Sequence, residues 1–229
     1  MIALLVLLLA AQPAGYDRHE RTALLDFHYS WPAEAEAIPA LRAELRRRMA
    51  IAYADALANA RESRDSAAGA HVPFYREQYD KVWSVEARNA RFLSLTADNR
   101  TDQNGAHPNR DFDALVWDRT RLQARSAAAL LGPAVLARLQ PIYCSHLQST
   151  VAARGGEPSA RCPPLAERVL SFLDQDGNGR FETLHVLVPP YVAASYADGS
   201  FVVDVLFNRG DLSGMAAADR EGFEETPGR

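Results

Sequence analysis

One long helical pattern constrains the fold of this chain more than any other feature. Over residues 38–61, small and apolar side chains recur at steps of three and four, while arginines and acids fill the other faces. The recurring positions are Ile38, Leu41, Leu45, Met49, Ala52, Ala56 and Ala60. This spacing predicts an amphipathic α-helix whose first turn accepts Pro39, followed by a loop over 63–69. Because such a helix has one apolar face, a second element must cover it.

Segments in which apolar and polar residues alternate predict the strands that pack against this helix. The alternating segments, rich in β-branched and aromatic residues, are 24–31, 82–87, 91–96, 112–117, 181–188 and 201–207. Further helix is expected over 124–151, with a break at Gly132-Pro133 and a new segment starting at Pro141, and again over 211–223. The chain is therefore predicted to be an α+β protein, in which an antiparallel sheet packs against the long N-terminal helix and further helices.

The N-terminal segment predicts export. Residues 2–11 form an apolar run that small residues and then a charged segment follow. A membrane span needs about 20 apolar residues, so residues 1–15 are interpreted as a signal peptide, although no basic residue precedes the run. The alternative is a buried strand or helix. Export predicts a periplasmic or secreted protein with no stable membrane anchor after cleavage. Residues 16–229 then form either a single domain or two subdomains, over 22–100 and 101–223.

The overall charge excludes one class of partner. The formal net charge is −4 and the isoelectric point is about 5.9. Binding to nucleic acid or to an anionic membrane surface requires a basic field, which this composition does not provide. Neither partner is expected.

The two cysteines fit an exported protein. Cys144 and Cys162 flank a short segment containing glycines and a proline, so the chain can turn back between them. Their even number predicts a disulfide, worth about 3 kcal/mol in the loop-entropy description. The alternative is two unrelated buried thiols. A zinc site is not expected, because neither cysteine belongs to a CxxC pair and only His146 could join them.

The segment 104–109 contains the first candidate for chemistry. A histidine flanked by glycine and proline is accessible, and it can titrate near neutral pH, so His107 is a candidate base or metal ligand. No HExxH, GxSxG or P-loop motif accompanies it. The structural alternative is that Gly105 adopts a positive φ, Pro108 fixes the exit of the loop, and His107 hydrogen-bonds loop carbonyls.

A second candidate site is an acidic loop that matches the first half of a calcium-binding loop. Asp174, Asp176 and Asn178 occupy positions one, three and five, Gly179 occupies position six, and Glu182 occupies position nine. Position twelve is His185 rather than glutamate, and a strand follows, so an EF-hand is not expected. A weaker calcium site is one interpretation, and a hydrogen-bonded turn before the strand is the other.

Several short motifs resemble a known family. They are Phe92-Leu93-Ser94-Leu95, Gly105-Ala106-His107-Pro108-Asn109, Phe112-Asp113 with Leu115, Pro190-Tyr191, and Tyr196-Ala197-Asp198-Gly199. In this order they resemble the extracytoplasmic domain of RsiV-type anti-sigma factors and the non-catalytic N-terminal region of PdaC-like peptidoglycan deacetylases. The loop of that family usually carries two glycines before its alanine and histidine. Here Asn104 stands for one of them, and asparagine also tolerates left-handed backbone geometry.

The resemblance implies an α+β domain outside the cytoplasm and, in the RsiV case, a lysozyme sensor. It implies a binding role for Asn104, Gly105, His107, Asn109 and Tyr191. The printed sequence contains no sigma-binding segment and no deacetylase region, so neither activity is expected. The first hypothesis is a non-enzymatic envelope domain that binds peptidoglycan or a protein such as lysozyme. The alternatives are a cell-wall hydrolase using His107 and a calcium-stabilised structural protein.

Overall fold

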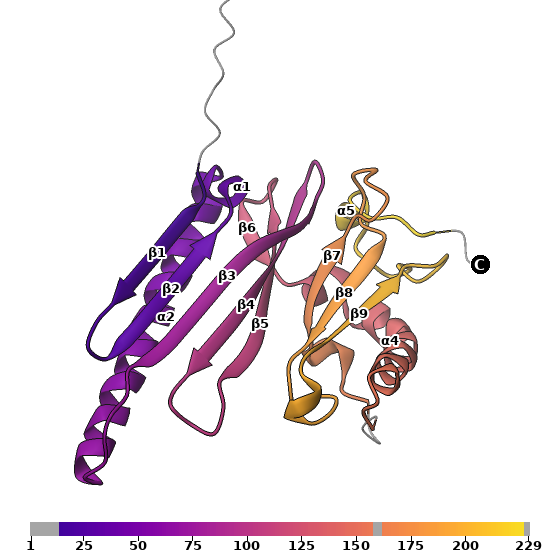
Figure 1. Cartoon of the computed structure of the whole chain (residues 1–229). Helices are drawn as coiled ribbons and strands as arrows, with labels where there is room; N and C mark the ends of the chain where they lie inside the picture. The colour runs from indigo at the N-terminus through magenta and orange to yellow at the C-terminus, as the bar shows by residue number, and fades with distance from the viewer. Residues whose placement is uncertain (1–13, 158–161, 227–229) are drawn as a thin grey trace, which may run out of the picture.

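The computed structural model describes residues 14–157 and 162–226, and it contains two β-sheets (Figure 1). The first sheet has the order β1-β2-β3-β4-β5-β6, and the second has the order β7-β8-β9. The strands of the first sheet are β1 Tyr16–Arg21, β2 Leu25–Trp31, β3 Glu77–Arg88, β4 Phe92–Asp102, β5 Asn109–Asp118 and β6 Gln123–Arg125. Those of the second are β7 Val169–Leu173, β8 Thr183–Val188 and β9 Phe201–Leu206. The α+β prediction is confirmed, whereas the predicted signal peptide falls almost entirely outside the described residues.

The remaining elements are helical. The α-helices are α1 Ala33–Glu36, α2 Pro39–Gly69, α3 Ala127–Leu131, α4 Pro133–Ala153 and α5 Ala217–Arg220, and the 3-10 turns are η1 Leu165–Glu167 and η2 Tyr196–Asp198. Among the helices within the described ranges, none combines the length and the apolar character that a membrane crossing requires.

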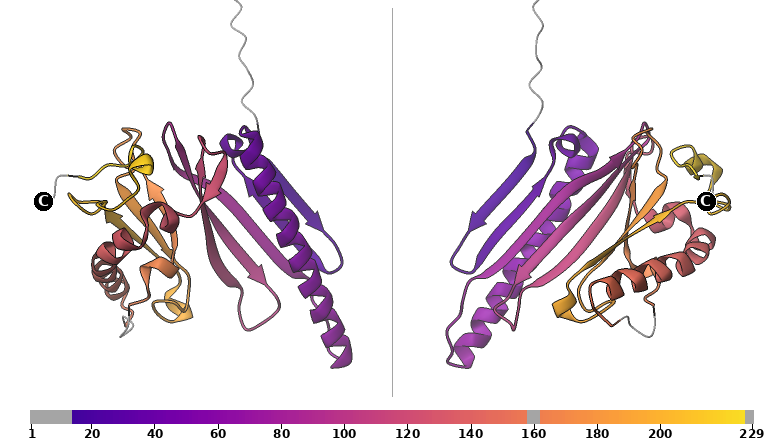
Figure 2. Two further views of the ribbon diagram at one scale, coloured as in Figure 1. Left: turned by 180° about the vertical axis from the view of Figure 1, so that it is seen from behind. Right: turned by 45° about the vertical axis from the view of Figure 1, so that its right-hand side comes forward.

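The long helix covers one face of the first sheet (Figure 2). Its buried residues are Leu41, Leu45, Met49, Ala56 and Ala60, and they share a core with the alternate residues of β2 that point inward, Leu25, Phe27, Tyr29 and Trp31. The helix continues to Gly69, so the loop predicted over 63–69 is wrong. No proline interrupts that stretch, and the helix extends as an exposed, polar segment until the first glycine ends it.

The first sheet is mixed rather than purely antiparallel. β2 and β3 run parallel, while each of the other neighbouring pairs is antiparallel. α2 lies between β2 and β3 in the sequence, and a helical crossover returns the chain to the end of the sheet from which it started. The long helix is therefore the connection that makes this pair parallel.

The second sheet is covered by α4. The helix buries Val135, Leu139, Tyr143, Leu147 and Val151 against the strands, and it contacts β9 directly. The predicted start of a new segment at Pro141 is wrong, because Pro141 lies inside α4. Its side chain is exposed, so its ring displaces no core residue.

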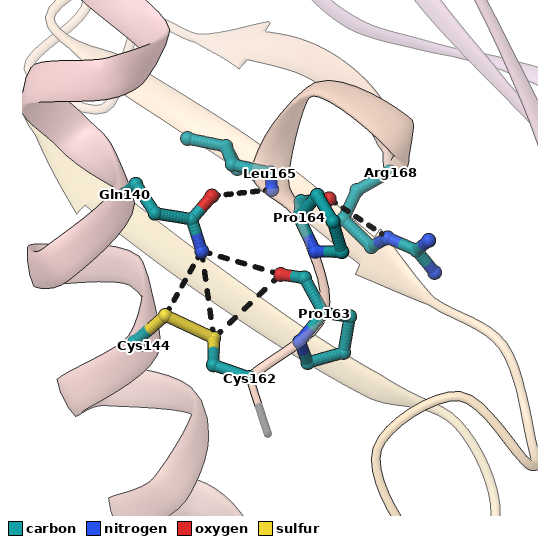
Figure 3. Close-up of a disulfide and its surroundings, with 7 residues drawn as sticks. All are labelled: Gln140, Cys144, Cys162, Pro163, Pro164, Leu165 and Arg168. Carbon is teal, nitrogen blue, oxygen red and sulfur yellow. Dashed lines mark hydrogen bonds between the residues drawn. A yellow bond between two sulfur atoms is a disulfide. The ribbon is translucent and has the colours of Figure 1, made fainter.

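The predicted disulfide is present and ties α4 to the segment before η1 (Figure 3). The Cα atoms of Cys144 and Cys162 are 5.7 Å apart, within the ordinary range for such a bridge. The Gln140 side-chain amide donates to Cys144 Sγ at 3.0 Å, and its Oε1 accepts from the Leu165 N–H at 2.6 Å. The bridge and this glutamine together fasten the chain as it leaves α4 and turns toward β7.

The two sheets meet at β4. Leu93 and Leu95 point into the core under α2, whereas Phe92 belongs to the core of the second sheet. The buried Ser94 Oγ accepts a hydrogen bond of 2.9 Å from the Phe172 N–H of β7. The two subdomains considered from the sequence would divide between residues 100 and 101, which lie inside β4. The chain instead leaves the first sheet between β6 and α3.

Candidate functional site

A groove of about 450 Å³ lies between the two sheets. Its charged and titratable lining residues are Asp80, Glu86, Asp98, Arg100, Arg110 and His185, and its apolar lining residues include Val82, Phe112 and Leu187. Strands β3, β4 and β5 supply one wall, and β8 supplies the other. A concave surface between two sheets that combines apolar side chains with polar groups is an arrangement suited to ligand binding.

Strand periodicity explains why these residues share the groove. Successive side chains of a strand point to opposite faces. On β4, Leu93 and Leu95 face α2, so Thr96, Asp98 and Arg100 face away from it. The groove is thus formed from the sheet surface that α2 does not cover.

The second wall follows from the same rule. On β8, Leu184, Val186 and Val188 are buried in the core shared with α4. The intervening residues His185 and Leu187 therefore point away from that core and line the groove. Each sheet has one face covered by a helix, and the groove lies between the faces that remain.

The arginines of the groove neutralise Asp98. The Arg110 guanidinium donates to both carboxylate oxygens of Asp98, at 3.0 and 2.8 Å, and Arg100 donates at 3.1 Å. Burial alone would raise the pKa of Asp98, but these hydrogen bonds and charges lower it below its usual value. Arg110 also stacks over the Phe112 ring, with 5.1 Å between the guanidinium carbon and the ring centroid. These contacts hold the arginine and the aromatic ring in fixed positions.

The other titratable groups of the groove wall are also paired. The Asp80 carboxylate lies 2.6 Å from Nδ1 of His28 on β2, and Thr96 donates a hydrogen bond to Glu86. His185 Nδ1 lies 2.7 Å from Asp204 Oδ1. When Nδ1 carries the proton and donates it to this carboxylate, Nε2 of the neutral ring is an acceptor. The groove therefore carries charges of both signs, and each of its carboxylates has a hydrogen-bond partner.

The loop that carries His107 contacts the second sheet at one end of the groove. Along β4, the groove residues lie between Ser94, where the sheets meet, and the hairpin loop after Asp102. The His107 ring stacks on Tyr196 with 3.6 Å between centroids, and its Nε2 lies 2.8 Å from the Tyr191 hydroxyl. The loop thus joins the β4–β5 hairpin to the connection between β8 and β9.

Tyr191 has a strained backbone at this contact. Its φ is 68°, a left-handed value that costs a residue with a side chain about 1–3 kcal/mol. Its side chain is 65% exposed. This conformation places the exposed Tyr191 ring beside His107.

Both ring nitrogens of His107 take part in hydrogen bonds. Nδ1 lies 3.0 Å from the Pro108 carbonyl, to which it can only donate, so Nε2 accepts from the Tyr191 hydroxyl. The Pro108 carbonyl also accepts from the Tyr196 hydroxyl at 2.5 Å. The predicted bond from His107 to a loop carbonyl is present, and the histidine serves as a structural link.

The other predicted binding residues are placed around this link. Asn104, rather than Gly105, has the left-handed conformation, with φ 60°, so the predicted positive φ at Gly105 is wrong. Asn104 takes this conformation because its N–H bonds Asp102 Oδ1 at 2.9 Å and its side-chain amide bonds a carbonyl before β3. Asn109 begins β5 and pairs with Thr101. The structure thus brings His107 and Tyr191 into contact, while Asn104, Gly105 and Asn109 shape the hairpin.

The predicted calcium-loop residues lie between β7 and β8. Asp174, Asp176 and Glu182 bring their oxygens together, whereas the Asn178 amide donates to Asp176 and to Glu224. Burial raises the pKa of Glu182, and the nearby Asp176 raises it further. His185 projects into the groove instead of toward this loop.

Sequence reasoning did not find the groove. Alternation along β3 and β4 shows which residues share a face, but it does not show that β8 lies opposite. The importance of Tyr196 was indicated only by its place in the family motif. His185 alternates with buried apolar residues of β8, and this alternation is the sequence pattern that indicates a side chain pointing away from the core.

Comparison with known proteins supports the fold alone. The sequence matches no known family model and no curated protein. The fold is similar to that of a DUF3298 family member from Bacteroides fragilis, with a TM-score of 0.56 and 11% identity, over 91% of this chain and 94% of that chain. It is also similar to a DUF3298 family protein from Pseudomonas aeruginosa, with a TM-score of 0.57 and 12% identity, over 94% of this chain and 95% of that chain. Both structural neighbours are described by their domain family, DUF3298, and not by an activity.

Proposed function

We propose that this chain is an exported, non-enzymatic domain of the cell envelope whose groove binds a glycan strand of the cell wall. The observation that carries the proposal is the groove between the two sheets. Export is supported by the apolar N-terminal run and by the disulfide between Cys144 and Cys162. The resemblance of the 104–109 loop to RsiV-type and PdaC-like domains supports the same location.

Charges of both signs in the groove favour a polar ligand without a large net charge. Asp98 is neutralised by Arg100 and Arg110, and Asp80 and Glu86 have their own partners. A strongly cationic or anionic ligand would meet no large field of opposite sign here. A sugar chain presents hydroxyl and amide groups to such side chains, and a sugar ring can pack on Phe112.

Glycan binding can be measured with soluble oligosaccharides released from peptidoglycan, by isothermal titration calorimetry. Arg100→Ala removes an exposed donor from the groove, and Phe112→Ala removes the aromatic surface. We expect each to weaken binding at least about tenfold, which corresponds to about 1.4 kcal/mol. Arg64→Ala is the control, because Arg64 lies on α2 and its side chain is 49% exposed, close to the 60% of Arg100.

The outcomes separate binding from catalysis. Absence of binding by the native chain, or equal binding by native, Arg100→Ala and Phe112→Ala proteins, would refute the groove as the site. Mass spectrometry of the ligand after incubation should show no cleavage. Cleavage that disappears in His107→Ala would instead establish a hydrolase.

Tyr191 supports a second candidate, a protein ligand such as lysozyme. Tyrosines with one exposed face are frequent anchors of protein interfaces, and the hydrogen bond to His107 holds Tyr191 in place. A pull-down with lysozyme should be weakened by Tyr191→Ala and unaffected by Tyr75→Ala, since Tyr75 is 64% exposed. Capture that does not depend on Tyr191, or no capture, would exclude this surface.

A further inference from the structure

The loop between β7 and β8 brings three carboxyl groups together. Asp174, Asp176 and Glu182 contribute oxygens that lie within 4.8 Å of one another. Two oxygens that bind one calcium ion at about 2.3–2.6 Å can be at most about 5 Å apart, so this spacing fits a shared ion. Three carboxylates so close together repel one another unless a cation compensates them.

Two oxygens of this cluster are buried without a hydrogen-bond partner. They are Asp174 Oδ1 and Glu182 Oε2. Glu182 is only 3% exposed, and its other oxygen, Oε1, accepts from the Gln175 N–H at 2.7 Å. Leaving a carboxylate oxygen buried and unpaired is costly, and buried charges are normally paired or bind a metal. These oxygens are therefore positioned to bind a cation.

The hydrogen bonds of the loop leave these oxygens available. The Gly179 N–H donates to Asp174 Oδ2 at 2.9 Å, and the Asn178 N–H donates to Asp176 Oδ1 at 3.1 Å. Gly177 and Gly179 have φ values of 72° and 81°, which let the loop turn back on itself. Asp174 is thus oriented by the backbone through Oδ2, which leaves its Oδ1 unpaired, whereas Asp176 also accepts from the Asn178 side-chain amide through Oδ2, at 3.0 Å.

The neighbouring polar side chains do not compensate the three acids. Asn178 Oδ1 accepts from the Arg180 N–H at 2.9 Å, so this amide braces the loop. Within the described part of the chain, the Arg180 guanidinium pairs with Glu224 at 3.7 Å rather than with the cluster.

We propose that Asp174, Asp176 and Glu182 bind a calcium ion. The donors are all oxygens, which hard cations prefer, and calcium tolerates the irregular geometry of a loop better than magnesium does. Water and main-chain carbonyls complete the coordination. With three carboxylates and an incomplete calcium-loop sequence, the affinity corresponds to that of extracellular modules, with a Kd of about 10⁻⁴–10⁻³ M.

The position of the loop gives the ion a structural role. Asn178 Nδ2 donates to Glu224 Oε1 at 2.7 Å, and Arg180 Nη2 donates to the Phe223 carbonyl at 2.5 Å. The Phe223 side chain is fully buried in the core of the second sheet. An ion that fixes the loop therefore also fixes the C-terminal segment against this core.

Thermal unfolding of the full chain tests the site directly. The protein is freed of metal with a chelator, dialysed, and melted with and without 10 mM calcium chloride. We expect calcium to raise Tm by about 3–10 °C, given the expected Kd and the size of the chain. Magnesium chloride at the same concentration should give a much smaller shift.

Two variants identify the ligands. Glu182→Gln keeps the shape and removes the buried charge, so its metal-free Tm should be equal to or higher than that of the native protein, while the calcium shift is lost. Asp176→Asn changes an exposed position, so the fold is retained, and calcium binding measured by calorimetry should weaken at least tenfold. Glu167→Gln, in an exposed glutamate outside the loop, should keep the full calcium response.

The proposal has clear contrary results. No Tm shift and no heat of binding up to 10 mM calcium would show that the cluster is only a hydrogen-bonded turn. Equal shifts with magnesium would overturn the assignment to calcium. A calcium response retained by both Glu182→Gln and Asp176→Asn would place the ion elsewhere. None of these results depends on whether the groove binds a glycan.

Discussion

Asp118 at the end of β5 provides the sharpest test of how the chain is held together. Its side chain is fully buried, and it accepts hydrogen bonds from the Arg91 and Arg121 guanidiniums at 3.1 and 2.9 Å. The same two arginines bond Asp219 on α5, at 2.6 and 2.7 Å. This ionic network fastens the C-terminal helix to the first sheet.

The substitution Asp118→Asn keeps the shape of the side chain and removes its charge. Burial alone would raise the pKa of Asp118, but hydrogen bonds from the Arg121 N–H and from the guanidiniums of Arg91 and Arg121 lower it from 3.8 to about 2. Since one pKa unit is worth about 1.4 kcal/mol, this corresponds to about 2.5 kcal/mol. The Arg121 side chain is 39% exposed, and solvent screens its share. We therefore expect the free energy of unfolding to fall by about 1–2.5 kcal/mol.

The pH dependence gives an independent check. A carboxyl whose folded pKa is lowered stabilises the protein above its unfolded pKa, and this contribution is lost as the pH falls through the folded pKa. The difference in free energy of unfolding between native and Asp118→Asn proteins should be constant above about pH 5 and should shrink as the pH falls toward 2. Urea denaturation followed by circular dichroism measures both quantities. Asp65→Asn is the control, because Asp65 is exposed and pairs with its exposed neighbour Arg64.

An unchanged free energy of unfolding for Asp118→Asn at pH 7 would refute this account of the network. A difference that does not narrow at low pH would refute the assigned pKa. Loss of the C-terminal segment alone, seen as two separate transitions, would show that this segment does not unfold together with the sheets.

Two further predictions concern packing and the disulfide. A Cβ at Gly222 would lie 2.8 Å from Cδ2 of the buried Phe92, so Gly222→Ala should lower the free energy of unfolding by about 1–3 kcal/mol in urea titration, whereas Gly105→Ala, in open space and without a positive φ, should change it little. Replacing Cys144 and Cys162 by serine should lower it by about 3 kcal/mol, and a loss well below 1 kcal/mol would show that the bridge does not restrain the unfolded chain.

The sequence predicts those elements that repeat a clear period. The apolar positions of α2 and the inward residues of β2 follow from periods of 3.6 and two, and both are found in one core. β1 was not predicted, because it is a charged edge strand whose burial alternates between half-buried and exposed. The positive φ could not be assigned within the 104–109 loop because both asparagine and glycine tolerate it, and the Asp102 side chain decides between them.

Strand direction and the groove depend on information that is not local. Apolar and polar residues alternate in the same way along parallel and antiparallel strands. The parallel direction of β2 and β3 can therefore be inferred only when α2 is recognised as a crossover connection. The groove requires the second sheet to lie opposite β3 and β4, which the buried contact between Ser94 and Phe172 determines. No periodic pattern records that contact.

The contact between His107 and Tyr191 tests whether the hairpin loop is fastened to the second sheet. The Tyr191 hydroxyl lies 2.8 Å from His107 Nε2 at an exposed position, so Tyr191→Phe should cost about 0.5–1.5 kcal/mol of unfolding free energy. His107→Ala should cost more, because it also removes the stacking on Tyr196. If the hydrogen bond is the link, Tyr191→Phe should cost almost nothing in the His107→Ala background, giving a coupling energy of at least about 0.5 kcal/mol. Tyr75→Phe, at a similarly exposed tyrosine, should show no coupling to His107. Additive effects of the two substitutions at His107 and Tyr191 would mean that the loop stays in place without this bond, and that the end of the groove is held by other contacts, such as that of Arg110 with Ser200.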